Sequence, residues 1–387
     1  MSWQIMKLAD LCTVITKGTT PSNIGESFTE SGVNYIRSEM ITDAKYISSN
    51  GMLYISDGTH EKLKRSQLKK GDILFSMAGV YLGKTAILRE EDVPANTNQA
   101  VALIRIDSSK CNLEYVYYFL NLPETVAKVN TVSGQAAQPN INLKQIGNIE
   151  IVLPDIETQN RIVNILSSYD DLIENNQKQI KLLEEATQRL YKEWFVELCF
   201  PRYENTPVID GVPQGWRKGL LGEIAFFKRG KTITREETCN GNVPVVAGGL
   251  EPAYYHNESN TVSPVITISA SGANAGFTRM YHTNIWASDC SFVDEKSTDS
   301  IYFVYCVLKN KKNDIDALQK GAAQPHVYAK DINALEILVP KAEYLEKFER
   351  IASPLFDKIR ALHNQIVLSK QARDRLLPKL MNGKLEV

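Results

Sequence analysis

The chain of 387 residues is too long for one ordinary hydrophobic core, which favours two or more domains. Its 23% charged and 43% hydrophobic residues are typical of a soluble globular protein, and no stretch approaches the ~20 apolar residues of a membrane span. The formal net charge of −1 gives no support from composition for nucleic-acid binding, so any DNA surface must be local. Residues 1–7 lack the apolar core of a signal peptide, so we expect a cytoplasmic protein.

The first half of the chain alternates short strands and short helices before one long helix. We expect strands over 72–77, 100–106 and 149–153, and a helix over 113–122. From Ile162 to Trp194 apolar residues recur with spacings that alternate four and three, and Asn176 and Thr187 fill the two remaining positions. This spacing is a heptad seam and predicts a coiled-coil helix.

The second half repeats this order after a linker. Residues 200–216 are rich in Pro, Gly and Asn and indicate the linker. A strand over 265–269, a helix over 300–309 and a strand over 335–339 follow, and a second heptad seam runs from Phe348 to Leu380, with Ser369 and Arg373 as polar interruptions. Pro354 falls inside this seam, so it marks either the true start of the helix or a kink.

The two halves are copies of one another. Ala136–Pro139 recurs as Ala322–Pro325, and the shift of 325 − 139 = 186 positions aligns about sixty residues without a gap. Upstream the match is weaker, with Thr97–Ala100 placed on Ala287–Cys290. Two long copies are not a solenoid, which needs at least three short ones. We interpret them as a pseudo-dimer in which similar scaffolds display different surfaces.

The predicted fold class is therefore α+β, with two pseudo-repeated globular domains, each followed by a long helix, and the helices paired as an antiparallel coiled coil. The alternative is two independent amphipathic helices, each lying on its own domain. The expected boundaries are 1–155 for the first globular domain, 156–200 for the central helix, 201–340 for the linker and second globular domain, and 341–387 for the C-terminal helix.

No catalytic or metal motif is present in the sequence. Gly79–Thr85 resembles a phosphate-binding P-loop, but only three residues separate its glycines and 86–88 indicates a strand where a helix is required. We expect a β-turn there, with Lys84 on a DNA phosphate. The six cysteines lack C-x-x-C spacing and the five histidines lack ligand spacing, so we expect neither a disulfide framework nor a metal site.

Small groups of polar and basic residues are the candidates for a local DNA surface. Lys and Arg contact phosphates, while Arg, Asn and Gln can read base edges. For any one of them, an ordinary solvated surface is the alternative. Asn96 and Asn257 suit base reading by type, and the DNA-binding candidates are Lys17, Thr19, Thr20, Lys62, Lys64, Arg65, Lys84, Asn98, Gln99, Lys228, Arg229, Lys231, Arg235, Asn274 and Arg279.

The chain resembles the specificity (S) subunits of type I restriction-modification systems. The resemblance rests on segments that run through the whole chain in the family's order: Gly134–Ile141 leading into 149–154, Thr158–Val163, Leu190–Phe195, Val212–Trp216 and Arg375–Leu385. The second copy departs from the pattern at Lys341–Glu346.

The resemblance implies a non-catalytic subunit with two target-recognition domains, each reading one half of a split double-stranded DNA target. It also implies that the helices set the gap and dock two copies of a methyltransferase (M) subunit, with restriction or translocase (R) subunits as further partners. S-adenosylmethionine, ATP and Mg would be held by partner chains, and this chain would hold no cofactor or catalytic residue. Candidates for the coiled coil and for partner binding are Ile162, Leu166, Ile173, Ile180, Leu183, Leu190, Trp194, Leu355, Ile359, Leu362, Ile366, Leu376 and Leu380.

Two other functions fit the sequence less well. One is a DNA-modifying enzyme with its own active site in a globular half. The other is a scaffold whose two domains bind proteins. Neither is supported by a motif, because the chain carries none of the catalytic signatures named above.

Overall fold

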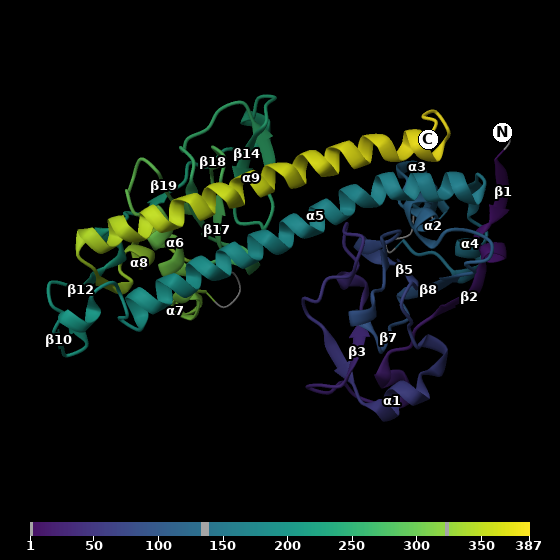
Figure 1. The fold of residues 1–387 in the computed structure, drawn as a ribbon, viewed down its shortest axis with the longest axis horizontal. Coiled ribbons are helices and arrows are strands. Elements are labelled where there is room, and N and C mark those ends of the chain that lie inside the picture. The colour runs from purple at the N-terminus through teal and green to yellow at the C-terminus, as the bar shows by residue number, and fades with distance from the viewer. Residues whose placement is uncertain (1–2, 133–138, 322–324) are drawn as a thin grey trace. The chain divides into compact units, whose positions relative to one another are not determined.

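The computed structural model describes residues 3–132, 139–321 and 325–387 (Figure 1). The repeated residues 136–138 and 322–324 lie outside this range. The chain divides into two compact units, the first made of Met1–Glu174 with Ile366–Val387 and the second of Asn175–Gln365. Both units contain parts of the two long helices, α5 (Ile156–Tyr191) and α9 (Ala342–Met381).

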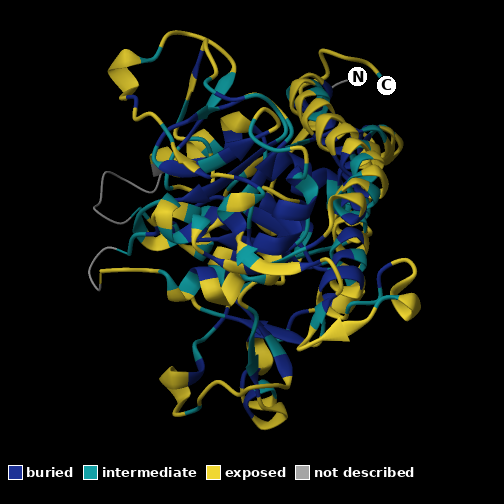
Figure 2. Cartoon of the chain, turned by 90° about the vertical axis from the view of Figure 1, so that its left-hand side faces the viewer, coloured by how far each residue is buried: buried dark blue, intermediate teal, exposed yellow. Residues whose placement is uncertain are grey.

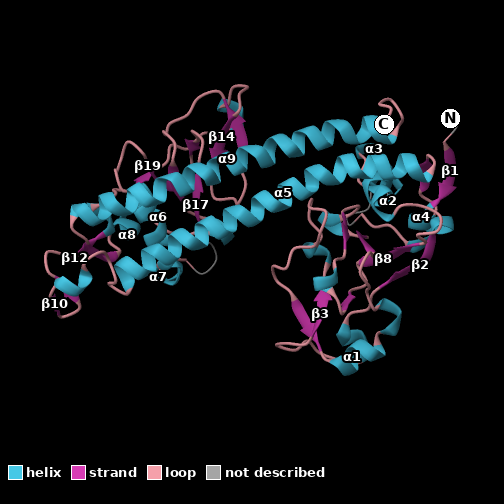
Figure 3. Ribbon diagram, in the orientation of Figure 1, coloured by secondary structure: helices cyan, strands magenta, loops and turns pink. Residues whose placement is uncertain are grey.

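Among the residues that the structure describes, the first unit contains three small sheets, with strand orders β2-β8-β5-β6, β4-β3-β7 and β1-β9 (Figure 3). All pairs are antiparallel except β3 with β7. The strands are β1 (Gln4–Lys7), β2 (Cys12–Lys17), β3 (Val33–Ile36), β4 (Leu53–Ile55), β5 (Ile73–Ser76), β6 (Thr85–Ile87), β7 (Ala95–Thr97), β8 (Val101–Ile106) and β9 (Glu150–Leu153). The helices are α1 (Asp57–Lys62), α2 (Leu113–Leu120), α3 (Pro123–Val132) and α4 (Leu143–Gly147).

The described part of the second unit repeats this topology, with sheets β13-β19-β16-β17, β15-β14-β18 and β12-β20 and one parallel pair of strands, β14 with β18. Its strands are β12 (Arg217–Leu220), β13 (Lys228–Arg229), β14 (Val243–Val246), β15 (Tyr254–His256), β16 (Val265–Ser269), β17 (Thr278–Tyr281), β18 (Trp286–Ala287), β19 (Cys290–Asp294) and β20 (Glu336–Val339), and its helices are α6 (Ile301–Asn310), α7 (Lys312–Ala317) and α8 (Ala329–Asn333). The linker carries a small hairpin of β10 (Val208–Ile209) and β11 (Val212–Pro213). The predicted internal repeat is confirmed as a repeat of fold.

The core of the first unit forms between α2 and the sheets. β5 is buried at every position, as expected of a strand covered on both faces. Asn112 caps α2 by accepting hydrogen bonds from the backbone N–H groups of Glu114 and Tyr115, which ends the preceding loop and starts the helix. Tyr115 and Val116 then reach zero exposure within the main cluster of apolar residues. In the second unit α6 takes the same place and is buried from Phe303 to Leu308.

Both long helices extend beyond the predicted seams. α5 begins at Ile156, before the first seam residue Ile162, and a π-helical turn over Lys192–Val196 follows it. α9 continues through Pro354, so this residue does not mark the helix start. Pro354 is exposed, where the carbonyl that loses its N–H partner can bond to water instead.

The two helices pair in antiparallel fashion within each unit. In the first unit, Ile162 and Leu166 near the start of α5 share a buried cluster with Leu377 and Leu380 near the end of α9. In the second, Trp194, just beyond the end of α5, packs edge-on against Phe348 near the start of α9, with ring centroids 6.3 Å apart. Figure 2 shows exposed residues along the outer sides of these helices. The predicted antiparallel coiled coil is confirmed, and the alternative of two independent helices is wrong.

Candidate nucleic-acid interface

In each unit, a glycine allows the end of one strand to come very close to a neighbouring loop. We call these loops, residues 98–100 and 288–289, the pinned loops. In the first, a Cβ on Gly18 would lie 1.8 Å from the carbonyl oxygen of Thr97, and the next residue, Thr19, donates its N–H to that oxygen at 3.1 Å. In the second, a Cβ on Gly230 would lie 2.3 Å from a loop carbonyl, and Lys231 donates its N–H to Ala287 at 2.9 Å. Both close approaches require glycine because no side chain fits.

The pinned loops differ in length. Three residues, Asn98–Ala100, separate β7 from β8, whereas two, Ser288 and Asp289, separate β18 from β19. The ungapped match of 97–100 with 287–290 is therefore wrong by one residue at its end. The pleated register of the sheet decides this, because β5 pairs Ser76 with Val101 and β16 pairs Ser269 with Cys290.

The loop of the first unit presents Gln99 at the surface. The Oε1 atom of Gln99 accepts a hydrogen bond from the hydroxyl of Thr20, just beyond the pinned glycine. Asn98 uses its own Oδ1 to accept the N–H of Ala100 at 3.1 Å and so closes the turn. Gln99 is exposed, whereas Asn98 is half-buried. Of these two predicted readers, Gln99 has the side chain that is available to a ligand.

Basic and polar residues surround Gln99. Lys17, Gln99, Asn140 and Lys144 line a cleft of about 520 Å³ whose other walls are mostly apolar. The turn that carries Asn140 is held by two backbone hydrogen bonds, from Gly79 N–H to Pro139 at 3.1 Å and from the N–H of residue 141 to Met77 at 2.9 Å. Arg65 donates to the hydroxyl of Thr19 at 3.4 Å, which adds a third cation nearby.

In the second unit, different side chains surround the corresponding loop, between β18 and β19. Asp289 accepts a hydrogen bond from the hydroxyl of Ser271, and Arg229 Nη2 lies 3.8 Å from its carboxylate. The turn is again held by a glycine, since Gly272 donates its N–H to Pro325 at 3.1 Å. The sequence analysis did not select Asp289. It lies directly before β19, where Ala100 lies directly before β8, so the repeat offers no polar counterpart that would have pointed to it.

Most of the other predicted DNA-binding residues have acidic or carbonyl partners. Lys62 pairs with Glu26, Lys64 with Glu61 and Lys84 with Asp43, and Asn274 and Arg279 donate to the carbonyls of Gly248 and Leu250. Lys228, Lys231 and Arg235 are exposed at β13 and the segment after it, as is Asn257 elsewhere in this unit. Asn96 is fully buried and donates hydrogen bonds to the carbonyl of Leu63 and the hydroxyl of Ser66. Its side chain is therefore not available to a base, although its residue type suits base reading.

The helix candidates are all buried or partly buried within the chain. The candidates that are buried in this chain are Ile162, Leu166, Ile173, Ile180, Trp194, Ile359, Leu362, Ile366 and Leu380, and the partly buried ones are Leu183, Leu190, Leu355 and Leu376. Large exposed side chains lie elsewhere on the helices. Leu182 is 63% exposed and Leu368, its equivalent 186 positions later, is 64% exposed.

In the second unit, the partly buried carboxyl of Glu349 caps the N-terminal end of α6. Glu349 of α9 accepts the backbone N–H of Phe303 at 2.8 Å and that of Tyr302 at 3.4 Å. It replaces a side-chain cap, because Ser300 at the N-cap forms no such bond. Burial raises the pKa of Glu349 to about 7, against the opposing effect of these two N–H donors.

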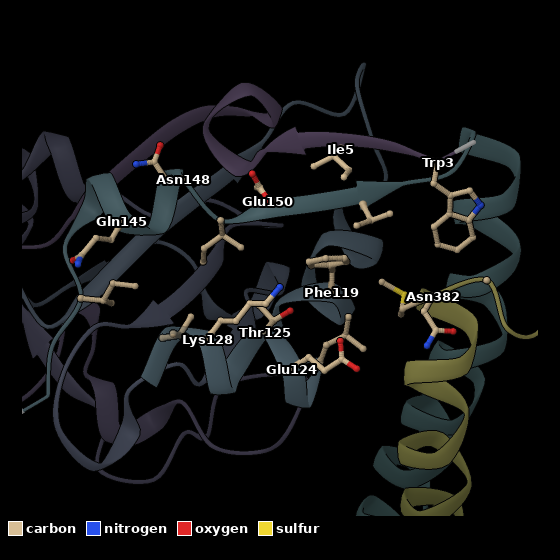
Figure 4. Close-up of a pocket in the computed structure, with 17 residues that line it drawn as sticks. Trp3, Ile5, Phe119, Glu124, Thr125, Lys128, Gln145, Asn148, Glu150 and Asn382 are labelled. Carbon is tan, nitrogen blue, oxygen red and sulfur yellow. The ribbon is translucent and has the colours of Figure 1, made fainter. Parts of the chain in front are cut away.

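A cavity of about 950 Å³ in the first unit lies beside β1, α3 and the end of α9 (Figure 4). Trp3, Ile5 and Phe119 provide apolar walls, and Lys128 and Glu124 stand on α3. Within 3–132, 139–321 and 325–387, no three His, Cys, Asp or Glu residues are grouped to hold a metal ion. No helix in those ranges is both long and apolar enough to cross a membrane.

The comparisons with known proteins agree with this duplicated arrangement. The family model described as the type I restriction modification DNA specificity domain matches residues 1–185 and 213–368. The MjaIX type I restriction enzyme specificity subunit of Methanocaldococcus jannaschii is 28% identical over 100% of this chain and 94% of its own length. The HindI specificity subunit of Haemophilus influenzae is 22% identical over 83% of this chain and 88% of its own.

A solved structure shares the fold. The crystal structure of the S subunit of a type I restriction-modification system from M. genitalium superimposes with a TM-score of 0.60 at 19% identity, covering 98% of this chain and 96% of that one. The family model covers both units, and the fold repeats in both as described above. The chain therefore belongs to the family of type I restriction-modification specificity subunits.

Proposed function

We propose that this chain is the non-catalytic subunit that gives a type I restriction-modification complex its DNA sequence specificity. Each unit would read one half of a split target. The observation that carries the proposal is the duplicated framework, in which glycine-pinned loops recur while the side chains they present differ. A repeated scaffold with divergent polar residues suits two different half-sites, because base contacts carry the sequence information.

The paired helices would set the gap between half-sites and dock two methyltransferase subunits. Leu182 and Leu368 support this, since exposed leucines at equivalent positions give two identical partners equivalent contacts. The seam residues are largely buried within the chain and would stabilise the pair instead. S-adenosylmethionine, ATP and Mg would be bound by the partner chains, restriction or translocase subunits would join the same complex, and the complex would act on DNA in the cytoplasm.

An exchange of one unit's reading segment tests the proposal. Residues 219–327 would be replaced by the corresponding segment of another specificity subunit, and methylated sites would be mapped in cells that express the methyltransferase partner. We expect one half of the recognised sequence to change and the other to stay the same. A change in both halves, or in neither, would contradict one unit reading one half-site.

Two measurements separate the alternatives. Transfer of labelled methyl groups to DNA by this chain alone would favour an enzyme with its own active site. Failure of the assembled complex to bind duplex DNA would favour a protein-binding scaffold. We expect no transfer by the isolated chain and binding by the complex.

A further inference from the structure

The two units share their cations and differ in the polar side chain between them. Lys17 ends β2 and Arg229 ends β13, directly before the pinned glycines. Lys144 is the second residue of α4 and Lys330 the second residue of α8. All four are exposed. Positively charged residues that recur at equivalent places suit a feature that every DNA sequence has, the phosphate backbone.

The side chain on the pinned loop is what changes. The first unit presents the amide of Gln99 and the second the carboxylate of Asp289. A hydroxyl from a neighbouring segment holds each of them, Thr20 for the amide and Ser271 for the carboxylate. A side chain oriented before DNA arrives loses less conformational entropy on binding, which favours a contact that depends on geometry.

The remaining hydrogen-bonding capacity of the two side chains differs in kind. The Gln99 oxygen has a second lone pair beside the one that Thr20 occupies, and its amide nitrogen can donate. Together they match the N6 amino group and N7 of adenine in the major groove. The Asp289 carboxylate only accepts when it is ionised, and it matches the N4 amino group of cytosine.

We propose that Gln99 reads an adenine in one half-site and Asp289 reads a cytosine in the other, while Lys17 with Lys144 and Arg229 with Lys330 contact phosphates. This assignment rests on the proposed function, because it presupposes that the units bind DNA. It goes beyond that function in naming one specificity-determining residue in each unit and the base that each selects.

The test is selection of bound duplexes from a random library by the full chain assembled with its methyltransferase subunits. The variants are Gln99→Glu and Asp289→Asn. Glu can still accept the Thr20 hydroxyl and Asn the Ser271 hydroxyl, so these two hydrogen bonds are retained while the readout changes. We expect Q99E to change one adenine to cytosine in one half-site only, and D289N to change one cytosine to adenine in the other. Affinity for the original site should fall roughly 5- to 150-fold.

Lys17→Ala is the matched control, because it removes a neighbouring charge and no base reader. We expect it to weaken binding to all sequences alike, to lower the salt dependence by about one phosphate contact and to leave every preferred base unchanged. Thermal unfolding of each variant, which should match the wild type because these side chains are at least partly exposed, verifies that folding is intact.

The outcomes separate this inference from the function on which it rests. If the wild-type complex selects a split sequence and Q99E and D289N select the same bases, the assignment of Gln99 and Asp289 is overturned while the specificity function stands. If the wild-type complex selects no sequence, the specificity function itself is overturned. A changed base preference in Lys17→Ala would overturn the division between phosphate and base contacts.

Discussion

Arg373 of α9 places its Nη1 atom 2.6 Å from Oδ1 of Asp170 of α5, across the helix pair of the first unit. The other oxygen of Asp170 accepts the hydroxyl of Tyr118 of α2, also at 2.6 Å. The Asp170 side chain is 6% exposed and that of Arg373 17% exposed. The seam's polar interruption at Arg373 therefore ties both long helices to the globular part of the unit.

Breaking this pair should destabilise the first unit strongly. Arg373→Ala leaves the Asp170 carboxylate buried without its ion partner, so we expect a loss of roughly 3–5 kcal/mol in the free energy of unfolding. The double variant Asp170→Asn with Arg373→Ala should lose less than the sum of the two single variants, because it leaves no unpaired charge. Urea unfolding of the purified chain measures the stability of the two single variants and of the double variant.

An exposed pair on the same helix is the control. Arg360 lies 2.9 Å from Asp357, with about half of each side chain exposed. Arg360→Ala should cost at most about 1 kcal/mol. Equal losses of unfolding free energy for Arg360→Ala and Arg373→Ala would show that the buried pair stabilises the chain no more than the exposed pair does.

Gly18→Ala should disturb the pinned loop. Its Cβ would overlap the Thr97 carbonyl, so the strand end or the loop must move, at a cost of roughly 1–3 kcal/mol. Because Gln99 lies on that loop, the complex should also lose selectivity in one half-site. Binding selection and thermal unfolding measure the two effects.

Gly58→Ala provides the comparison for this substitution. Gly58 lies in α1, where the nearest atom to an added Cβ is the Ser56 hydroxyl at 3.8 Å, so alanine should be neutral or stabilising by up to about 1 kcal/mol. Gly230→Ala should reproduce the Gly18 effect in the other half-site. Unchanged selectivity in both Gly18→Ala and Gly230→Ala would contradict the pinned-loop arrangement.

Glu349 should make the stability of the second unit depend on pH. Its pKa is raised from 4.5 to about 7 by burial, so between these values the folded chain holds a proton that the unfolded chain releases. The contribution of this carboxyl to the free energy of unfolding is present at low pH. It falls by up to about 3 kcal/mol as the pH rises to about 7. Glu349→Gln should therefore be more stable than the wild type at pH 8 and similar to it at pH 4.5. A stability difference that is the same at both values would contradict the raised pKa.

The proposed role of the helices in setting the gap predicts the effect of a paired insertion. Asn176 Nδ2 lies 3.2 Å from Gln365 Oε1, which places these residues at the same level of the two helices. One heptad inserted directly after Gln177 and another directly before Gln365 would keep the seam in register and lengthen both helices by about 10 Å. The gap between half-sites should grow by about three base pairs. Methylation mapping checks this, and an active complex with the original gap would contradict the role.

Local and repetitive signals in the sequence predicted much of the fold. The heptad spacing from Ile162 to Trp194 predicts a coiled-coil helix, and the 186-residue repeat predicts two similar units. These predictions succeeded because helical periodicity and repetition are properties of neighbouring residues and of whole segments.

By itself the sequence determined the duplicated α+β design, the paired helices and the family, since each follows from pattern. Only the tertiary structure decided which polar side chains are available. Gln99 meets Thr20 across 79 positions, Asp170 meets Arg373 across 203, and Asn96 is buried although its neighbour Asn98 is partly exposed. The reason is physical: burial and pairing of a side chain depend on segments distant in the chain, and residue type does not report them.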